Sequence, residues 1–408
     1  MWKRFASTVR CPLCRGHLGL HVFDQRRVEL EREHLQAAEK RSILDEDFAI
    51  YIEAGVLECR ACGVDYPIFD GLAVLLPYAT RLHAEFLDRM QPQARALGRA
   101  VRFANAQPAP GEQFVLSSFS TEWLAYDYDG VIWEMDYADH ERRFLAEIGS
   151  YRPRPGSQGR FLELGCGLGI TTQMAQKHFG VDAIGVDLSL AALRATVKFK
   201  DNPFLHFVQA SVFSLPFEYG SFETVYSRGV LHHTYSTEKA FEALAKFCAP
   251  GGATYLWVYG PKSIGDNALR RVLFVAERAV RRTLRGRASG PLANVLLYPL
   301  ATAYLAFNRY RRYRDPSIQP YNFQRALHAA RDRFTPEFAY RHSAEEVSRW
   351  FRDAGFADIE VVDWRAMPSA DHDDYRRNTG VRGRRTPTAT EQSAIPRAPI
   401  ADGLANFT

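Results

Sequence analysis

The feature that most constrains the fold is a short apolar strand that runs directly into a glycine-rich turn and then into a helix. The apolar run at 160–164 is followed by Gly165-Cys-Gly-Leu-Gly169 and by a helical pattern that extends to His178. Glycines permit a tight turn and let the backbone approach a ligand closely. Short apolar runs and amphipathic helices then alternate as far as residue 259. This alternation predicts an α/β fold with a mostly parallel, doubly wound sheet.

Two carboxylates flank the predicted turn. Asp187 ends the next predicted strand, 18 positions after Gly169, where it can accept hydrogen bonds from ribose hydroxyls. Glu163 precedes the first glycine by two residues, and its charge suits a ligand with an ammonium and a sulfonium better than a pyrophosphate. The dinucleotide fingerprint G-x-G-x-x-G would need glycine at position 170, where Ile170 stands. The turn therefore favours a cationic nucleoside over a dinucleotide.

Five motifs follow one another along the chain. They are Glu163-x-Gly-x-Gly-x-Gly169, Gly185-Val-Asp187, Leu215-Pro-Phe-Glu-Tyr-Gly-Ser-Phe222, Gly229-Val-Leu-His-His-Thr234 and Pro250-Gly-Gly252. In this order they resemble the motifs of Rossmann-like, S-adenosylmethionine-dependent methyltransferases, in the branch that acts on ubiquinone and other small molecules. The resemblance covers about 160–261 and, more loosely, 340–386. It implies a methyltransferase that uses S-adenosylmethionine as its cofactor.

The resemblance also implies roles for single residues in binding the cofactor. Glu163 would lie near its methionine part, and Asp187 would bind the ribose hydroxyls, with Leu188 packed near the adenine. The loop that wraps the cofactor would consist of Gly165, Cys166, Gly167 and Gly169, with Cys166 as a small packed residue.

This chain departs from the family's pattern at one cofactor position. The family usually has an acidic residue that contacts the adenine amino group where Ser211 stands here. Ser211 could accept a weaker hydrogen bond, or the backbone of Val212 could replace it.

Two adjacent histidines are the candidates for acid–base chemistry. Methyl transfer from a sulfonium is a direct displacement, so a general base is needed only when the acceptor must lose a proton. His232 and His233 follow the fourth predicted strand, and imidazole has a suitable pKa for this task. A role in shaping the pocket is the alternative for both. His342 and Tyr259 are further candidates.

Two cysteine pairs predict a metal site near the N-terminus. Cys11-Pro-Leu-Cys14 and Cys59-Arg-Ala-Cys62 have ligand spacing, and four thiolates complete a closed, structural zinc site. The segment 59–77 is similar to the zinc-ribbon proteins that activate tRNA, rRNA and release-factor methyltransferases. That resemblance implies a module that stabilises the catalytic domain or presents substrate to it.

The patterns divide the chain into four parts. We expect a zinc-ribbon module at 1–80, a helical and aromatic connecting segment that could form a lid at 81–158, and the methyltransferase domain at 159–386. The domain would carry an Arg-rich helical insertion at about 262–332 and a last edge strand at 378–384. Residues 387–408 are polar with scattered prolines, which predicts a disordered tail.

The cysteines and an apolar, arginine-flanked patch bear on where the protein is located and what it contacts. The cysteine pattern fits a reducing compartment, and we find no signal peptide, so we expect a cytoplasmic protein. An apolar patch at 295–305, flanked by arginines, permits peripheral contact with a membrane. The leading hypothesis is methyl transfer to a small-molecule or lipid-linked acceptor. The alternatives are an RNA methyltransferase that grips its substrate with the zinc module and the arginines, and a non-catalytic scaffold.

Overall fold

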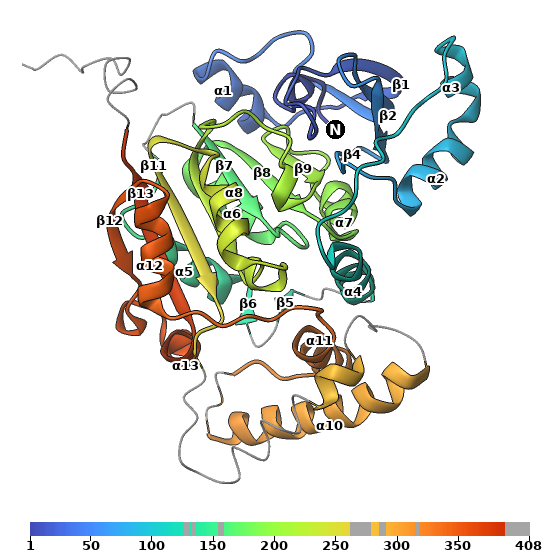
Figure 1. Ribbon diagram of the computed structural model, residues 1–408. Coiled ribbons are helices and arrows are strands. Elements are labelled where there is room, and N and C mark those ends of the chain that lie inside the picture. Colours follow the sequence, from blue (N-terminus) through green and yellow to red (C-terminus); the bar gives the residue numbers. More distant parts are fainter. Residues whose placement is uncertain are drawn as a thin grey trace, which may run out of the picture.

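One mixed sheet organises the molecule (Figure 1). The computed structural model describes residues 1–125, 130–132, 135–153, 159–261, 279–284, 291–314, 316 and 318–387. Within these residues, eleven strands hydrogen-bond in the order β1-β2-β3-β4-β9-β8-β7-β10-β11-β13-β12. The parallel strands are β7 (Arg160–Leu164), β8 (Asp182–Asp187), β9 (Leu205–Gln209), β10 (Phe222–Arg228) and β11 (Cys248–Val258). The predicted parallel, doubly wound sheet is confirmed.

The predicted position of the last strand is wrong. We expected an edge strand at 378–384, but β13 (Thr379–Arg385) lies between β11 and β12 (Phe356–Val361) and is antiparallel to both. β13 is buried from Thr379 to Gly383, whereas most of β12 faces solvent. Its two glycines allow close packing, because a Cβ on Gly380 would lie 2.9 Å from the ring of Tyr375. Glycine has a low strand propensity, so the sequence did not predict a central strand here.

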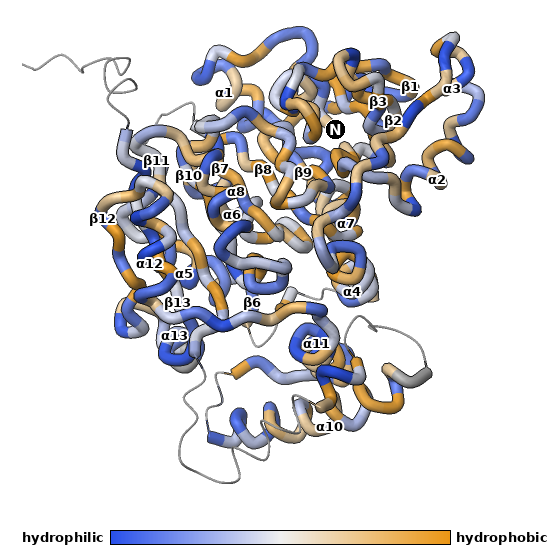
Figure 2. Tube along the Cα trace, viewed as in Figure 1, coloured by the Kyte–Doolittle hydropathy of each residue, from blue (hydrophilic) through white to orange (hydrophobic). Residues whose placement is uncertain are grey.

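Helices cover both faces of the sheet and create two hydrophobic cores. Against one face pack α8 (Thr237–Ala245) and α12 (Ala344–Asp353). The other face is covered by α2 (Arg81–Arg89), α5 (Tyr137–Ile148), α6 (Ile170–Phe179), α7 (Ala191–Lys198) and α13 (His372–Arg377). Hydrophobic stretches run along the central strands between these layers (Figure 2).

The N-terminal module extends the same sheet. Its strands are β1 (Gly19–Arg27), β2 (Ile50–Cys59), β3 (Val64–Phe69) and β4 (Leu72–Val74), and α1 (Arg32–Lys40) lies between the first two. β4 pairs in parallel with β9, so Ala73 lies opposite Val208. Arg4 also donates to both carboxylate oxygens of Asp182 at 2.7 and 3.1 Å. The module is therefore joined to the parallel sheet by backbone and side-chain contacts.

A helical layer lies over one end of the sheet. It contains α4 (Glu112–Leu124), α10 (Pro291–Arg314) and α11 (Phe323–Phe334), together with a small hairpin of β5 (Val131–Ile132) and β6 (Met135–Asp136). The short helix α3 (Gln91–Ala96) lies apart from this layer, beside α2. In Figure 1, α11 lies between α4 and α10, and α10 forms the outer edge of the molecule. No described helix is long and apolar enough to cross a membrane. The domain boundaries stay predictions.

Some expected features fall on residues that the structure does not describe. These are parts of the aromatic segment 119–133 and of the insertion, and the tail from residue 388 onward.

Candidate functional site

The turn after β7 requires glycine. Gly165, Gly167 and Gly169 have φ values of 76°, 50° and 75°, which L side chains rarely adopt. A Cβ on Gly165 would lie 2.1 Å from Val230, and one on Gly169 would lie 2.6 Å from Phe207. Neither position has room for a side chain. The sharp turn therefore exposes backbone at the carboxyl end of β7, as the sequence predicted.

Asp187 is fixed at the end of β8 by three hydrogen bonds. The Gly167 N–H donates to its Oδ2 at 2.8 Å, while the N–H and Oγ of Ser189 donate to its Oδ1 at 2.8 and 2.7 Å. A carboxylate offers about four lone-pair sites, two on each oxygen, so Oδ2 can still accept a hydrogen bond from a ligand. Burial raises the pKa of Asp187, and the three donors counteract this effect. The carboxylate is thus oriented before any ligand binds.

Glu163 places a second buried carboxylate beside the turn. Thr172 donates its hydroxyl hydrogen to Glu163 Oε2 at 2.5 Å. Burial raises the pKa of Glu163 to about 8, and the hydrogen bonds from the threonines lower it in part. A cationic ligand would offset the cost of ionising this group.

A cavity of about 1100 Å³ opens over these groups. Most of the predicted cofactor residues line it: Glu163, Gly165, Cys166, Gly167, Asp187, Leu188 and Val212. Gly169 and Ser211 do not line it. Gly169 acts instead at the helix start, where it precedes α6 in the left-handed conformation.

Glu112, which sequence reasoning missed, supplies a carboxylate beside Ser211. Glu112 begins α4 and lines the cavity. The Ala109 N–H donates to Glu112 Oε2 at 2.9 Å. Burial raises the pKa of Glu112, and the Ser211 side chain and the Ala109 N–H counteract this effect. A carboxylate thus lies near position 211, although it belongs to a helix about 100 residues earlier in the chain.

The two candidate histidines differ in their relation to the cavity. His233 lines the cavity, and its Nδ1 lies 2.7 Å from the Phe338 carbonyl oxygen. That contact makes Nδ1 the donor and leaves Nε2 as an acceptor, with no hydrogen-bond partner among the described residues. Burial lowers the pKa of His233 to about 4, so the ring is neutral at physiological pH. His232 is fully buried against Tyr259 and does not line the cavity.

Of the two further candidates, Tyr259 lines the cavity and donates its hydroxyl hydrogen to Asp332 Oδ2 at 3.2 Å. His342 is not a lining residue, and it contacts the Thr237 hydroxyl at 2.9 Å. Neither contact points to a role in catalysis.

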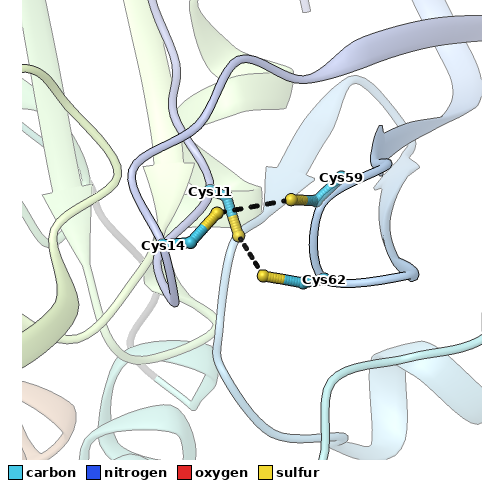
Figure 3. Close-up of side chains that lie close together, drawn as sticks. All are labelled: Cys11, Cys14, Cys59 and Cys62. Carbon is cyan, nitrogen blue, oxygen red and sulfur yellow. Dashed lines mark hydrogen bonds between the residues drawn. The ribbon is translucent and has the colours of Figure 1, made fainter.

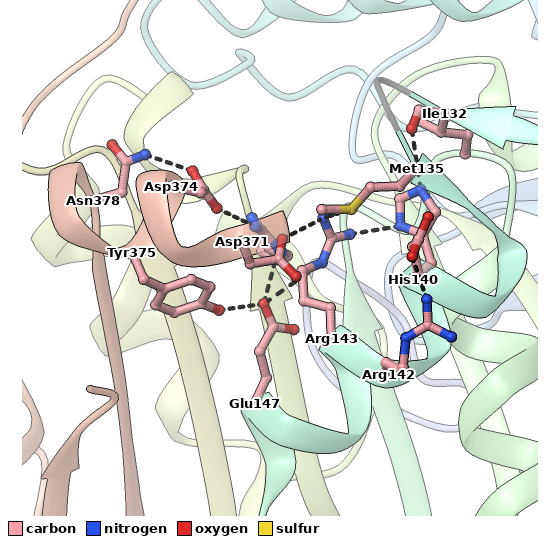
Figure 4. Close-up of polar contacts among 12 residues, drawn as sticks. Ile132, Met135, His140, Arg142, Arg143, Glu147, Asp371, Asp374, Tyr375 and Asn378 are labelled. Atoms are coloured by element: carbon pink, nitrogen blue, oxygen red, sulfur yellow. Dashed lines mark hydrogen bonds and ion pairs between the residues drawn. The ribbon is translucent and has the colours of Figure 1, made fainter. Parts of the chain in front are cut away.

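A second polar cluster also lines the cavity, and Figure 4 shows the contacts within it. Asp371 is fully buried, and neither of its carboxylate oxygens has a hydrogen-bond donor among the described residues. Arg143 approaches Asp371 Oδ1 at 3.8 Å, too far for a hydrogen bond, and contacts His140 Nδ1 at 2.7 Å. Burial raises the pKa of Asp371 to about 6. An unsatisfied buried carboxylate on a cavity wall is suited to receive a hydrogen-bond donor from a ligand.

A fully buried carboxylate, Glu147, contacts residues of this cluster. It accepts hydrogen bonds from the hydroxyls of Tyr226 and Tyr375 and pairs with Arg228 at 3.0 Å. Arg228 also pairs with Asp374 at 2.6 Å. Because these partners lie far apart in sequence, no local pattern could have predicted the cluster.

The four paired cysteines converge at the base of the N-terminal module (Figure 3). Their sulfur atoms all lie within 4.8 Å of one another, with 4.0 Å between Cys11 and Cys62 and 3.5 Å between Cys14 and Cys59. Tetrahedral zinc with Zn–S bonds of about 2.3 Å requires sulfur–sulfur distances of about 3.8 Å. The predicted ligand set therefore fits zinc.

Removing one thiolate should release the metal and loosen the module. We expect wild-type protein to contain about one zinc per chain and Cys59→Ser to contain little, with a thermal midpoint several degrees lower. Elemental analysis and a thermal scan measure both quantities. Cys248→Ser, which changes a buried cysteine outside the module, should retain zinc. Full zinc in Cys59→Ser would contradict the assignment.

The raised pKa of Glu163 predicts a pH-dependent stability. In the unfolded chain this carboxyl ionises near its ordinary pKa, so the folded state loses stability as pH rises from about 4.5 to about 8. Glu163→Gln removes that loss. Without cofactor, the variant should match wild type at pH 5 and unfold at a higher temperature at pH 8.5. Glu218→Gln, at an exposed glutamate, should behave as wild type at both pH values. An equal shift of Glu163→Gln at both pH values would contradict the assignment.

Comparison with known proteins identifies two domains. Residues 162–256 match the model of a methyltransferase domain, and residues 3–71 match that of Trm112p-like proteins. Phosphoethanolamine N-methyltransferase 2 of Caenorhabditis elegans is 30% identical over 146 residues, which are 35% of this chain and 32% of that protein. The chloroplastic tocopherol O-methyltransferase of Arabidopsis thaliana is 30% identical over 117 residues, 27% of this chain and 34% of that protein. The chain thus spans about a third of the length of these relatives.

Solved structures with similar folds are more distant in sequence. Phosphoethanolamine N-methyltransferase 2 of Haemonchus contortus is 16% identical, with a TM-score of 0.40, over 69% of this chain and 62% of that one. A complex of the Haloferax volcanii Trm112 methyltransferase activator with a methyltransferase gives 15% identity and a TM-score of 0.36, over 61% of this chain and 91% of the other. From the two domain matches and the cysteine cluster, this chain combines a Trm112-like zinc-ribbon domain with a methyltransferase domain.

Proposed function

We propose that this protein transfers a methyl group from S-adenosylmethionine to a small-molecule or lipid-linked acceptor. The observation that carries the proposal is one cavity lined by two chemically different groups of residues. One group is the carboxylate-flanked glycine turn, and the other includes a buried carboxylate without a hydrogen-bond donor among the described residues. The names of two relatives support a small acceptor, since they act on phosphoethanolamine and tocopherol.

In this proposal, three carboxylates hold the cofactor. Asp187 accepts hydrogen bonds from the ribose hydroxyls, because its carboxylate is already oriented at the end of β8. Glu112 accepts from the adenine amino group in place of an acid at position 211. Glu163 faces the cationic methionine part. The cofactor supplies a methyl carbon with a good leaving group, and the chain supplies alignment and exclusion of water.

The acceptor would lie beside Asp371, which lines the cavity. This carboxylate can accept a hydrogen bond from the acceptor and so orient it toward the glycine turn. When the attacking atom carries a proton, His233 Nε2 is the acceptor for that proton, because its Nδ1 is committed to Phe338. Trp123 helps to exclude water, since its ring lies 3.5 Å from the Cβ position of Gly167.

We propose a structural role for the zinc domain. It pairs with β9 through β4, and its cysteine cluster lies outside the cavity.

An RNA methyltransferase is the second candidate function, because the domain resembles Trm112 proteins. Against that reading, the sequence after β10 is Ser227-Arg-Gly229 and lacks the Asn/Asp-Pro-Pro-aromatic signature of enzymes that methylate exocyclic base amines. The cytoplasmic location likewise stays a proposal.

A labelling experiment tests the proposal. The protein is incubated with S-adenosylmethionine labelled in its methyl group and with cell extract, which is then separated into lipid, RNA, protein and small-molecule fractions. We expect label in the lipid or small-molecule fraction. For an acceptor that loses a proton, His233→Gln should lower the rate by roughly 10²- to 10⁴-fold with little change in cofactor affinity. His178→Gln, an exposed histidine paired with Glu141, is the matched control.

Each alternative gives a different result in that experiment. Label confined to RNA would overturn the acceptor class. Absence of label, together with absence of heat on titration with S-adenosylmethionine, would favour the non-catalytic scaffold.

A further inference from the structure

Helix α10 is apolar on two opposite sides. One side, with Ala293, Leu297 and Ala301, is buried against α11. The other side carries large side chains that remain exposed among the described residues: Val295 67%, Tyr298 47%, Phe307 58%, Tyr310 58% and Tyr313 86%. α10 also lies at the outer edge of the molecule, with α11 between it and α4 (Figure 1). Several large exposed apolar and aromatic side chains on one helix indicate an interaction surface.

The charge of α10 indicates which kind of partner fits this surface. The helix contains no Asp or Glu, and its last six residues include Arg309, Arg311, Arg312 and Arg314. Figure 2 shows both hydrophobic and hydrophilic stretches along α10. Tyrosines beside arginines suit the headgroup region of a bilayer, where aromatic rings lie between apolar and polar layers and arginines attract anionic lipid.

The same end of α10 borders the cavity. Tyr310, Arg311 and Arg314 line it, together with Ile318 and Tyr321 from the segment that follows. A molecule that leaves a membrane at this helix would therefore meet the cavity directly. The surface and the opening are built from one helix, which links docking to access.

We propose that the exposed face of α10 docks on an anionic membrane surface and that the acceptor enters the cavity from the lipid headgroup region. The source of the acceptor rests on the proposed function, whereas the docking does not. Val295 and Phe307 favour lipid over a nucleic acid, because phosphate recognition needs arginines but no row of exposed apolar side chains.

Sedimentation with vesicles tests the docking without any turnover. The full chain is mixed with vesicles of pure phosphatidylcholine or of phosphatidylcholine with 30% phosphatidylglycerol. We expect binding to the anionic vesicles that weakens with added salt. Arg309→Gln/Arg312→Gln should lower the partition coefficient roughly 25-fold, and Phe307→Ser/Tyr313→Ser roughly tenfold. These four residues do not line the cavity.

Matched controls separate docking from misfolding and from general surface charge. Arg81→Gln/Arg365→Gln removes two exposed arginines elsewhere, and Val197→Ser removes an exposed apolar side chain on α7. Both controls should bind vesicles as wild type does, and the thermal midpoint of every variant should stay within about 2 °C of wild type. If one double variant unfolds, the other still tests the surface.

The outcomes are distinct from those of the labelling experiment. Equal binding to both vesicle types, or wild-type binding by both double variants, would overturn the docking surface. Binding to transfer RNA in a mobility shift, lost in the arginine double variant and without vesicle binding, would overturn it in favour of a nucleic-acid surface. Anionic vesicle binding by a protein without methyl transfer would leave the docking intact and remove the proposed function.

Discussion

The hydrogen bond from Gly167 N–H to the Asp187 carboxylate is the contact on which the site depends. It ties the turn after β7 to the end of β8, so two neighbouring strands define the floor of the cavity. The positive φ values of the three glycines make this approach feasible, and the contacts with Val230 and Phe207 leave no room for other residues. A preformed turn of this kind lowers the ordering cost of binding a nucleoside.

The zinc domain is connected to that floor through hydrogen bonds. Leu75 N–H donates to the Gln209 carbonyl oxygen at 2.8 Å, and the Gln209 side chain donates to the Leu188 carbonyl oxygen at 2.9 Å. The pairing of β4 with β9 continues this connection along the sheet. A metal ion that orders the domain would therefore also support β9, the strand between β4 and β8. This arrangement gives a fused zinc domain a physical means of stabilising a methyltransferase domain.

Local patterns predicted much of the fold and part of the site. The glycine turn and the cysteine pairs could be predicted because their geometry depends on residues close together in sequence, and Asp187 followed from the strand that it ends. Glu112 and Asp371 could not be predicted, since each reaches the cavity from an element outside the five motifs. The distinction between His232 and His233 depends on the distant Phe338 carbonyl. The central place of β13 likewise depends on packing against Tyr375, not on strand propensity.

A crystal structure with S-adenosylhomocysteine tests the central claim most directly. The account predicts ribose hydroxyls within hydrogen-bond distance of Asp187 and the adenine amino group within hydrogen-bond distance of Glu112, with the homocysteine part beside Glu163. A nucleoside bound elsewhere, or a ribose that leaves Asp187 without contact, would contradict it.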